Sequence, residues 1–293
     1  MGEARIKPDF SLVDLSVNSD VPVLAPRQFK FFVDLILSKS GIRLQESKMN
    51  LVSSRLSRRL RVNSLKTWDE YIDLLKANDP VEMSEFINVM TTNKTEFFRE
   101  QAHFDFIKQV FLPDAISSGN DHPLFWIGAS SFGQEIWSLV MILEKFRETH
   151  PSMDYKVLGT DIDTKVLGKA QEAVYEASLV EKDVPPSMIK KFFLKGSGPN
   201  EGYYRFSPEY SDRVKFRQHN LCSMTEKIPI HFDVIFLRNV LIYFKPETVE
   251  NVITKALRHL KPGGYLILGH CESIVEMKWN LELMQHSTYR KLG

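Results

Sequence analysis

Residues 232–244 read Phe-Asp-Val-Ile-Phe-Leu-Arg-Asn-Val-Leu-Ile-Tyr-Phe, an apolar run that Arg238 and Asn239 interrupt near its middle. Its first part, Phe232 to Leu237, has the apolar character of a buried strand and lacks the charge spacing of a helix. A guanidinium is rarely buried without a partner, because removing it from water is costly. The Arg-Asn pair therefore marks the end of the strand. Ligands of open α/β sheets bind beyond the carboxyl ends of the strands, so we interpret the pair as part of a binding site rather than a locally paired core arginine.

Strands and helices alternate on both sides of this run from about residue 105 onward. Strands are predicted at 124–128, 155–160, 213–218, 232–237 and 264–269, and helices at 133–147, 164–173 and 247–260. This α/β pattern predicts βαβ crossovers and a Rossmann-like, doubly wound, mostly parallel sheet. Weak alternation over residues 281–292 predicts a closing hairpin.

The rest of the chain divides into four further segments. Residues 180–212 hold too many prolines and glycines for one crossover helix, so we expect a small antiparallel β insertion there. Helical spacing over residues 25–90 predicts a small all-α domain, with Gly41 ending its first helix. Residues 1–24 show no sustained periodicity and are interpreted as a flexible arm. A linker at 91–104 then joins the helical domain to an α/β domain at 105–293.

Composition excludes several classes of protein. The chain of 293 residues is 43% hydrophobic and 26% charged, as in soluble globular proteins. Its net charge of +1 argues against a generally basic nucleic-acid-binding surface. Cys222 and Cys271 give neither a disulfide framework nor a metal cluster, and they fit a reducing cytoplasm. No stretch approaches the roughly 18 uncharged apolar residues of a membrane helix. We therefore expect a cytoplasmic monomer with no metal, no nucleic-acid partner and no membrane insertion.

Polar residues follow three of the predicted strands. The loop from Gly128 to Glu135 is rich in small residues, which let a ligand approach the backbone, and its acidic residue suits a cationic or uncharged ligand such as a sulfonium amino acid. Asp161 is placed to accept both hydroxyls of a ribose, whereas Asp163 fits a helix cap. Asn220 and Leu221 offer an amide and an apolar side chain to an adenine ring, although an ordinary turn explains the asparagine equally well.

Two other segments were weighed for chemistry. His270 beside Cys271 lacks a third group, so a nucleophilic triad is not expected there. The linker stretch from Thr91 to Glu100 reads either as a capped hinge helix or as a polar lid over the open end of the sheet.

Together these segments resemble the chemotaxis receptor methyltransferase family of CheR type, which methylates glutamate side chains with S-adenosylmethionine (SAM). The stretch from Thr92 to Glu100 is similar to the family's linker motif, and residues 232–244 are similar to its most recognisable core motif. Residues 260–266 and 195–202 also match in type and spacing. The resemblance extends from about residue 26 to the C-terminus.

The resemblance implies a SAM-dependent methyltransferase domain with a defined set of site residues. Around the cofactor, or its product S-adenosylhomocysteine, it implies Asn93, Thr95, Arg99, Glu135, Asp161, Asn220, Leu221, Arg238 and Asn239. Tyr243 is expected close to the transferred methyl group. Arg99 and Arg238 are expected to be catalytic residues together with Tyr243. Arg55, Arg58 and Arg59 of the second helix are expected to meet acidic receptor helices, and the inserted sheet to dock a tether peptide at the receptor's C-terminus.

One departure from the family pattern keeps alternatives open. The family's first loop usually reads Ser-Thr-Gly-Glu-Glu-Pro-Tyr-Ser, whereas residues 131–138 read Ser-Phe-Gly-Gln-Glu-Ile-Trp-Ser. Glu135 is retained, but the preceding carboxylate becomes Gln134, which leaves a non-catalytic adaptor as an alternative. A nicotinamide-dependent oxidoreductase is disfavoured by the missing Gly-x-Gly-x-x-Gly motif. A nucleic-acid methyltransferase is disfavoured by the near-neutral charge and the missing aromatic Pro-Pro tetrapeptide.

Overall fold

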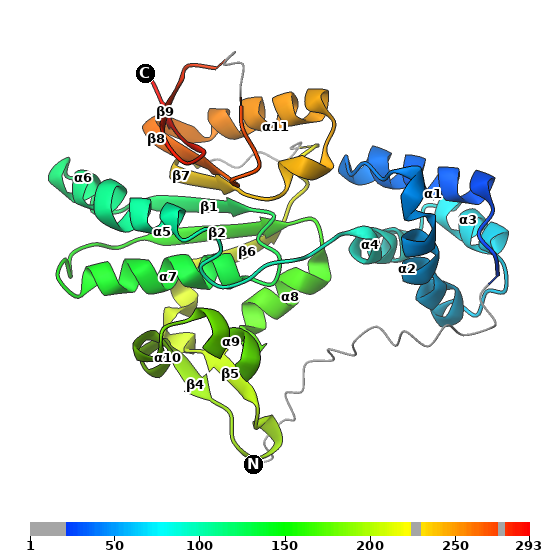
Figure 1. The fold of residues 1–293 in the computed structure, drawn as a ribbon, viewed down its shortest axis with the longest axis horizontal. Helices are drawn as coiled ribbons and strands as arrows, with labels where there is room; N and C mark the ends of the chain where they lie inside the picture. Colours follow the sequence, from blue (N-terminus) through cyan, green and yellow to red (C-terminus); the bar gives the residue numbers. More distant parts are fainter. Residues whose placement is uncertain (1–21, 224–229, 275–278) are drawn as a thin grey trace.

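The computed structural model describes residues 22–223, 230–274 and 279–293, so nearly all of the predicted arm lies outside the described residues (Figure 1). A helical domain comes first and a larger α/β domain follows it. The helical domain consists of α1 (Pro26–Ser40), the short 3-10 turn η1 (Glu46–Lys48), α2 (Met49–Val62), α3 (Trp68–Lys76) and α4 (Pro80–Met90).

Local sequence signals determine where these helices begin and end. α1 begins at Pro26, whose fixed φ and missing N–H suit the first helical position. It ends as predicted at Gly41, which has a φ of 76° that glycine adopts without strain. α3 begins with a capping box in which the Thr67 hydroxyl and the Glu70 carboxylate each accept the other residue's backbone N–H.

The α/β domain is built on a seven-stranded sheet of order β6-β2-β1-β7-β8-β10-β9. All neighbouring pairs from β6 to β8 are parallel, and the C-terminal β9–β10 hairpin adds β10 antiparallel to β8. This confirms the doubly wound sheet and the closing hairpin. The strands are β1 (Leu124–Gly128), β2 (Lys156–Asp161), β6 (Val214–Gln218), β7 (Phe232–Leu237), β8 (Leu260–Leu268), β9 (Leu281–Gln285) and β10 (Thr288–Lys291).

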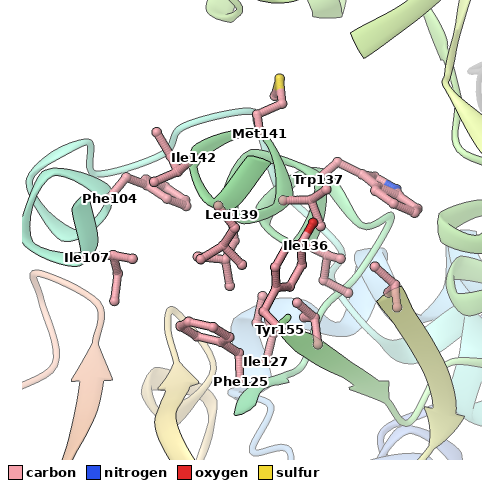
Figure 2. Close-up of a cluster of buried hydrophobic side chains, with 14 of the residues drawn as sticks. Phe104, Ile107, Phe125, Ile127, Ile136, Trp137, Leu139, Met141, Ile142 and Tyr155 are labelled. Carbon is pink, nitrogen blue, oxygen red and sulfur yellow. The ribbon is translucent and has the colours of Figure 1, made fainter. Parts of the chain in front are cut away.

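Each central strand is buried on both faces, which explains its continuous apolar sequence. Phe125 and Ile127 of β1 point into one core layer, whereas Trp126 points into the other. Figure 2 shows the first layer, where the β1 side chains meet Ile136 and Leu139 of α7. The covering helices are α5 (Ala102–Phe106), the π-helical turn η2 (Ile107–Phe111), α6 (Leu112–Ser117), α7 (Gln134–Arg147), α8 (Thr164–Glu172) and α11 (Pro246–Arg258).

A three-stranded antiparallel sheet of order β3-β5-β4 forms the predicted insertion. Its first strand lies at Val174–Glu176, ahead of the predicted start at residue 180, because β3 follows α8 almost directly. The other elements of this region are α9 (Ala177–Asp183), α10 (Pro186–Phe192), β4 (Phe193–Lys195), η3 (Gly198–Asn200), β5 (Tyr203–Phe206) and η4 (Pro208–Arg213).

The helical domain lies beyond the carboxyl ends of the parallel strands (Figure 1). Within the described parts of the chain, no helix combines the length and apolar character needed to cross a membrane. The side chains that follow the strand ends therefore face a second domain rather than open solvent.

The structure corrects the prediction that Arg59 meets a receptor. Its side chain is 11% exposed and donates from Nε to Glu82 of α4 at 3.0 Å and from Nη1 to Glu85 at 3.0 Å. Hydrogen bonding to Glu82 raises the pKa of Arg59, so the guanidinium stays charged within this network. Its neighbour Arg58 is exposed. Adjacent residues of a helix point in directions about 100° apart, so Arg59 of α2 points into the core while Arg58 points to the surface.

Replacement of Arg59 by alanine tests this assignment. Glu82 is buried and would keep an uncompensated charge, so we expect Arg59→Ala to lower the free energy of unfolding by about 3–5 kcal/mol. The exposed neighbour supplies the control, since Arg58→Ala should change stability by no more than about 0.5 kcal/mol. Urea titration followed by circular dichroism measures both values. Equal stabilities of the two variants would contradict the structural role of Arg59.

Candidate active site

A deep cleft lies between the helical domain and the open edge of the large sheet. It encloses about 1010 Å³, including its open mouth. The residues that line it come from six segments of the chain, 40–44, 90–99, 129–135, 161–162, 219–221 and 238–244. The first two come from the helical domain and the linker, and the others follow strands or begin α7. All the predicted cofactor-binding and catalytic residues line this one cleft, whereas Arg55, Arg58 and Arg59 do not.

The backbone around the cleft is strained at several positions. Phe98, Glu100, Ala129, Ser131 and Asn239 all have φ between 51° and 57°, a left-handed conformation that non-glycine residues adopt only at a cost. Such strain persists only where surrounding contacts hold it. Its concentration in the linker and the loops after β1 and β7 is typical of a functional site.

Asp161 ends β2 with its carboxylate buried in the cleft. Its Oδ2 accepts the N–H of Ser131 at 2.8 Å, and its Oδ1 accepts the N–H of Asp163 at 2.9 Å. Burial raises the pKa of Asp161 to about 6, although these backbone N–H groups work against the shift. The backbone N–H of Ile162 also interacts with this carboxylate, which leaves lone-pair capacity for a further donor.

Asp163 caps α8, as predicted. It accepts the N–H groups of Lys165 and Val166, and its Oδ2 also accepts the Thr91 hydroxyl at 2.9 Å and the Asn93 amide at 2.8 Å. One carboxylate therefore holds both the start of α8 and the start of the linker. Asn93 owes its place at the cleft wall to this contact.

Arg238 is the most deeply buried charge of the cleft, with a side-chain exposure of 0%. Its guanidinium lies 3.1 Å from Glu100 of the linker and 3.2 Å from Glu135 of α7, and it donates to the backbone oxygen of Arg99. Asn239 donates its amide to the other oxygen of Glu100 at 3.2 Å. The strand end, the linker and the start of α7 thus meet at one cation.

The two carboxylates beside Arg238 differ in their electrostatics. Burial opposes the charge on Glu100, but hydrogen bonds from Asn239 and Arg238 prevail and hold its pKa below the usual value. Burial raises the pKa of Glu135 despite Arg238, because this group has fewer donors around it. Oε1 of Glu135 has no hydrogen-bond partner among the described residues, and neither does Nε of Arg238. A buried carboxylate oxygen of this kind can accept a hydrogen bond from a ligand or from water.

Asn220 lies in the cleft, but its side-chain amide is already engaged. It donates to the backbone oxygen of Lys39 at the end of α1 at 2.7 Å and accepts the N–H of Cys222 at 3.0 Å. The side chain thus connects the two domains, which weakens the expectation that this amide binds an adenine ring. Leu221 is buried and gives the same wall an apolar surface.

Arg55 reaches the linker rather than open solvent. It donates to the backbone oxygen of Met90 at 2.7 Å and to the Thr92 hydroxyl at 3.0 Å. Arg55 therefore joins α2 to the start of the linker. Among the three arginines expected at a receptor, only Arg58 is exposed.

Comparison with known families accounts for this arrangement. The family model "CheR methyltransferase, all-alpha domain" matches residues 27–91, and "CheR methyltransferase, SAM binding domain" matches residues 93–290. The chain belongs to the CheR methyltransferase family. The SAM binding domain contains all the cleft-lining segments that follow the strands or begin α7, and the linker begins where the two family domains meet.

Curated relatives match this CheR-family chain over most of their own length. The chemotaxis protein methyltransferase of Salmonella typhimurium is 34% identical over 267 residues, which cover 91% of this chain and 90% of that protein. The Escherichia coli protein of the same name is 35% identical and covers 91% of each chain. Chemotaxis protein methyltransferase 2 of Pseudomonas aeruginosa is 38% identical over 238 residues, 80% of this chain and 82% of that one.

The polar groups of the cleft fit SAM chemically. The amino-acid end of the cofactor carries an ammonium, and the unpartnered Oε1 of Glu135 is a buried acceptor for such a donor. Asp161 keeps lone-pair capacity for a hydroxyl, and Leu221 provides an apolar wall. Four loop residues depart from the usual CheR pattern and lie outside the cleft lining, namely Phe132, Gln134, Ile136 and Trp137, whereas the retained Glu135 lies within it. The departures therefore alter the core beside the site and not its wall.

The sequence did not predict a role in the site for two acidic residues, Glu100 and Glu272, or for a cluster that contains two histidines. Glu100 stands next to Arg99 in the linker motif, and Glu272 follows β8; only the fold brings either to the end of β7. Glu100, His103 and His270 also offer potential metal-ligand atoms within 4.8 Å of one another. The Glu100 carboxylate is already bound to Arg238 and Asn239, so we interpret this cluster as an extension of the polar network.

The raised pKa of Asp161 predicts a pH-dependent cofactor affinity. Below about pH 6 the carboxyl is protonated and loses an acceptor site, so binding of S-adenosylhomocysteine should weaken as the pH falls through this value and be full above it. The shift acts on stability with the opposite sign: a raised folded pKa costs stability as the pH rises from 3.8 to about 6. Calorimetry across this range measures the affinity.

Two variants make this measurement specific. Asp161→Asn should bind roughly 10-fold or more weakly above pH 6 and lose most of the pH dependence, because the charge-assisted bonds are gone. Asp121→Asn, at a half-exposed aspartate before β1, should behave as the wild type does. A pH dependence that survives in Asp161→Asn would assign it to another group.

Proposed function

We propose that this chain transfers the methyl group of SAM to glutamate side chains of chemotaxis receptors, forming methyl esters that serve sensory adaptation. The names of its relatives and the match to both family domains support this function. The observation that carries the proposal is the cleft that the expected cofactor-binding and catalytic residues of the linker and the α/β domain line together with residues of the helical domain. A nicotinamide enzyme, a nucleic-acid methyltransferase and a non-catalytic adaptor find no comparable support.

The reaction makes modest chemical demands on the protein. SAM supplies a methyl group bonded to a positively charged sulfur. A receptor glutamate is ionised at neutral pH and needs no general base. Because opposite charges disappear during the transfer, a cleft that excludes water favours the reaction, and alignment of the two reactants supplies roughly 7–11 kcal/mol. The residues of the cleft are therefore assigned to binding and orientation.

Within this proposal, each part of the cleft has one task. Glu135 binds the ammonium of the cofactor and Asp161 binds its ribose hydroxyls. Thr95 and Arg99 of the linker, with Asn93, close over the amino-acid end. Leu221 packs against the adenine, and Asn220 supports this wall through its bond to α1. Tyr243 borders the methyl group, and Arg238 with Asn239 holds the strand end and linker in register.

The receptor is proposed to approach along α2. Arg58 is exposed on this helix, on the domain that forms one wall of the cleft. A basic side chain on this exposed surface favours encounter with acidic receptor helices mainly through the association rate. Arg55 contributes indirectly, since it is bonded to the linker.

The small sheet is proposed to hold a C-terminal tether of the receptor. Its order, β3-β5-β4, leaves β4 at an edge, where an extended peptide can add as a further strand. Leu194 of β4 is 53% exposed, and Glu181, Ile189, Lys190, Phe193, Lys195 and Tyr204 line a groove beside it. The cytoplasmic location and monomeric state expected from the sequence stay predictions.

Transfer of radiolabelled methyl groups to receptor-enriched membranes tests the function. We expect label in the receptor that mild alkali releases as methanol, because esters hydrolyse there and N-methyl groups do not. Receptors that lack their C-terminal tail should be methylated more slowly if the tether proposal holds. Alkali-stable label, or none from a protein that binds S-adenosylhomocysteine, would contradict ester formation.

Charge reversal at Arg58 tests the receptor-facing surface. Arg58→Glu should lower the rate of receptor methylation about 10-fold at low salt and less at high salt, while cofactor affinity stays unchanged. Lys108→Glu changes the charge equally at an exposed residue of η2, which lies between α5 and α6; α6 is at the end of the α/β domain away from the helical domain (Figure 1). If both reversals slow methylation equally, the effect comes from net charge and the assignment of Arg58 fails.

A further inference from the structure

Glu272, just after β8, has a carboxylate that is fully used by backbone donors. Its Oε2 accepts the N–H of Asn239 at 2.7 Å and that of Gly269 at 2.8 Å. Its Oε1 accepts the N–H of Leu241 at 2.7 Å and that of Ile242 at 3.3 Å. The residue is 5% exposed. One buried anion thus gathers four amides from the loops that follow β7 and β8.

These amides belong to the segment that carries the end of the cleft. Asn239 has a φ of 57°, a strained value for a residue with a side chain. The next residues turn into η5 (Leu241–Tyr243), whose first and second amides point at Glu272. Amides at the start of such a turn have no partner within it, so an anion there stabilises the turn. Glu272 therefore supports both the strained residue and the turn.

The supported segment places two site residues. Asn239 directs its amide to Glu100, which in turn pairs with Arg238. Tyr243, the last residue of η5, lines the cleft, and its backbone oxygen accepts the N–H of Arg43 from the helical domain. Arg238 has ion pairs of its own, whereas the position of Tyr243 depends on the turn. Loss of the anion should therefore displace Tyr243 more than Arg238.

Gly269 completes this close arrangement. A Cβ at this position would lie 2.6 Å from the side-chain Nδ2 of Asn239, 2.8 Å from Oε2 of Glu272 and 3.0 Å from the backbone nitrogen of Asn239. The first two distances are shorter than real Cβ contacts, so a side chain at position 269 would push the Asn239 and Glu272 side chains from their present positions. The carboxylate of Glu272 therefore holds the loops after β7 and β8 together.

We propose that Glu272 is a positioning residue for methyl transfer, which holds Asn239 and the Tyr243 turn at the reacting end of the cleft. This inference rests on the proposed function, since it concerns the same reaction. The carboxylate suits the task because it only accepts hydrogen bonds. A glutamine of the same shape would turn an NH₂ group toward two backbone N–H groups, and the segment would have to move.

Glu272→Gln is the main variant, with Asp233→Asn as its matched control. Asp233 is another buried carboxylate that accepts a backbone N–H, that of Leu124 at 2.8 Å, but it lies at the opposite end of β7. Each variant replaces a charged carboxylate that accepts backbone N–H groups with a neutral amide. A general cost in stability is therefore common to both variants. Only Glu272→Gln removes a carboxylate beside the cleft.

Steady-state methylation and calorimetry separate positioning from stability. We expect Glu272→Gln to lower kcat about 100-fold, as misplacement of a reacting group by about 1 Å does, with the affinity for S-adenosylhomocysteine changed only a few-fold. Asp233→Asn should keep the wild-type kcat per folded molecule. Gly269→Ala, which forces the same contact apart, should reproduce the loss in kcat. Unfolding midpoints establish the folded fraction of each variant.

The outcomes are decisive in each direction. If folded Glu272→Gln or Gly269→Ala turns over as fast as Asp233→Asn, Glu272 does not position the reacting groups. If both fail to fold while Asp233→Asn folds, Glu272 is a folding determinant and the proposal is overturned. A wild-type protein that binds the cofactor without transferring methyl groups would instead overturn the proposed function, and the two failures are therefore distinct.

Discussion

The buried guanidinium of Arg238 is the constraint on which the cleft depends. A charge removed from water needs partners, and this one has Glu100 from the linker, Glu135 from α7 and a backbone oxygen at Arg99. These groups are distant in sequence, so the linker must return across the end of β7 for the charge to be satisfied. The same contacts hold strained backbone at Glu100. The need of the buried Arg238 guanidinium for partners thereby produces the geometry of a binding site.

The helical domain is a structural part of this site rather than an appended module. Asp163 at the start of α8 binds the beginning of the linker through Thr91 and Asn93. On the opposite wall, Asn220 binds the end of α1. Both contacts lie at the carboxyl edge of the sheet, which the helical domain faces (Figure 1). The cleft therefore requires both domains, as the joint presence of the two CheR family domains in one chain suggests.

Much of the fold could be predicted because it follows from local rules. Strands buried on both faces are apolar throughout, so β1 and β7 were recognisable as continuous runs. Gly41 and Asp163 mark helix ends because their conformations or side chains complete the backbone there. β3 was missed because three residues at an insertion carry too little pattern, and they pair with β5 almost thirty residues later.

The sequence by itself determined the class of sheet, the helix ends and the set of polar residues that follow the strands, because periodicity and capping are properties of neighbouring residues. Only the tertiary structure decided how those residues are used. Arg58 and Arg59 are equivalent in sequence, yet one is exposed and the other is buried against Glu82. Glu272 gained its four amides only when two parallel strands ended side by side. Burial and partnership of a charge depend on contacts between distant segments, and no local pattern encodes them.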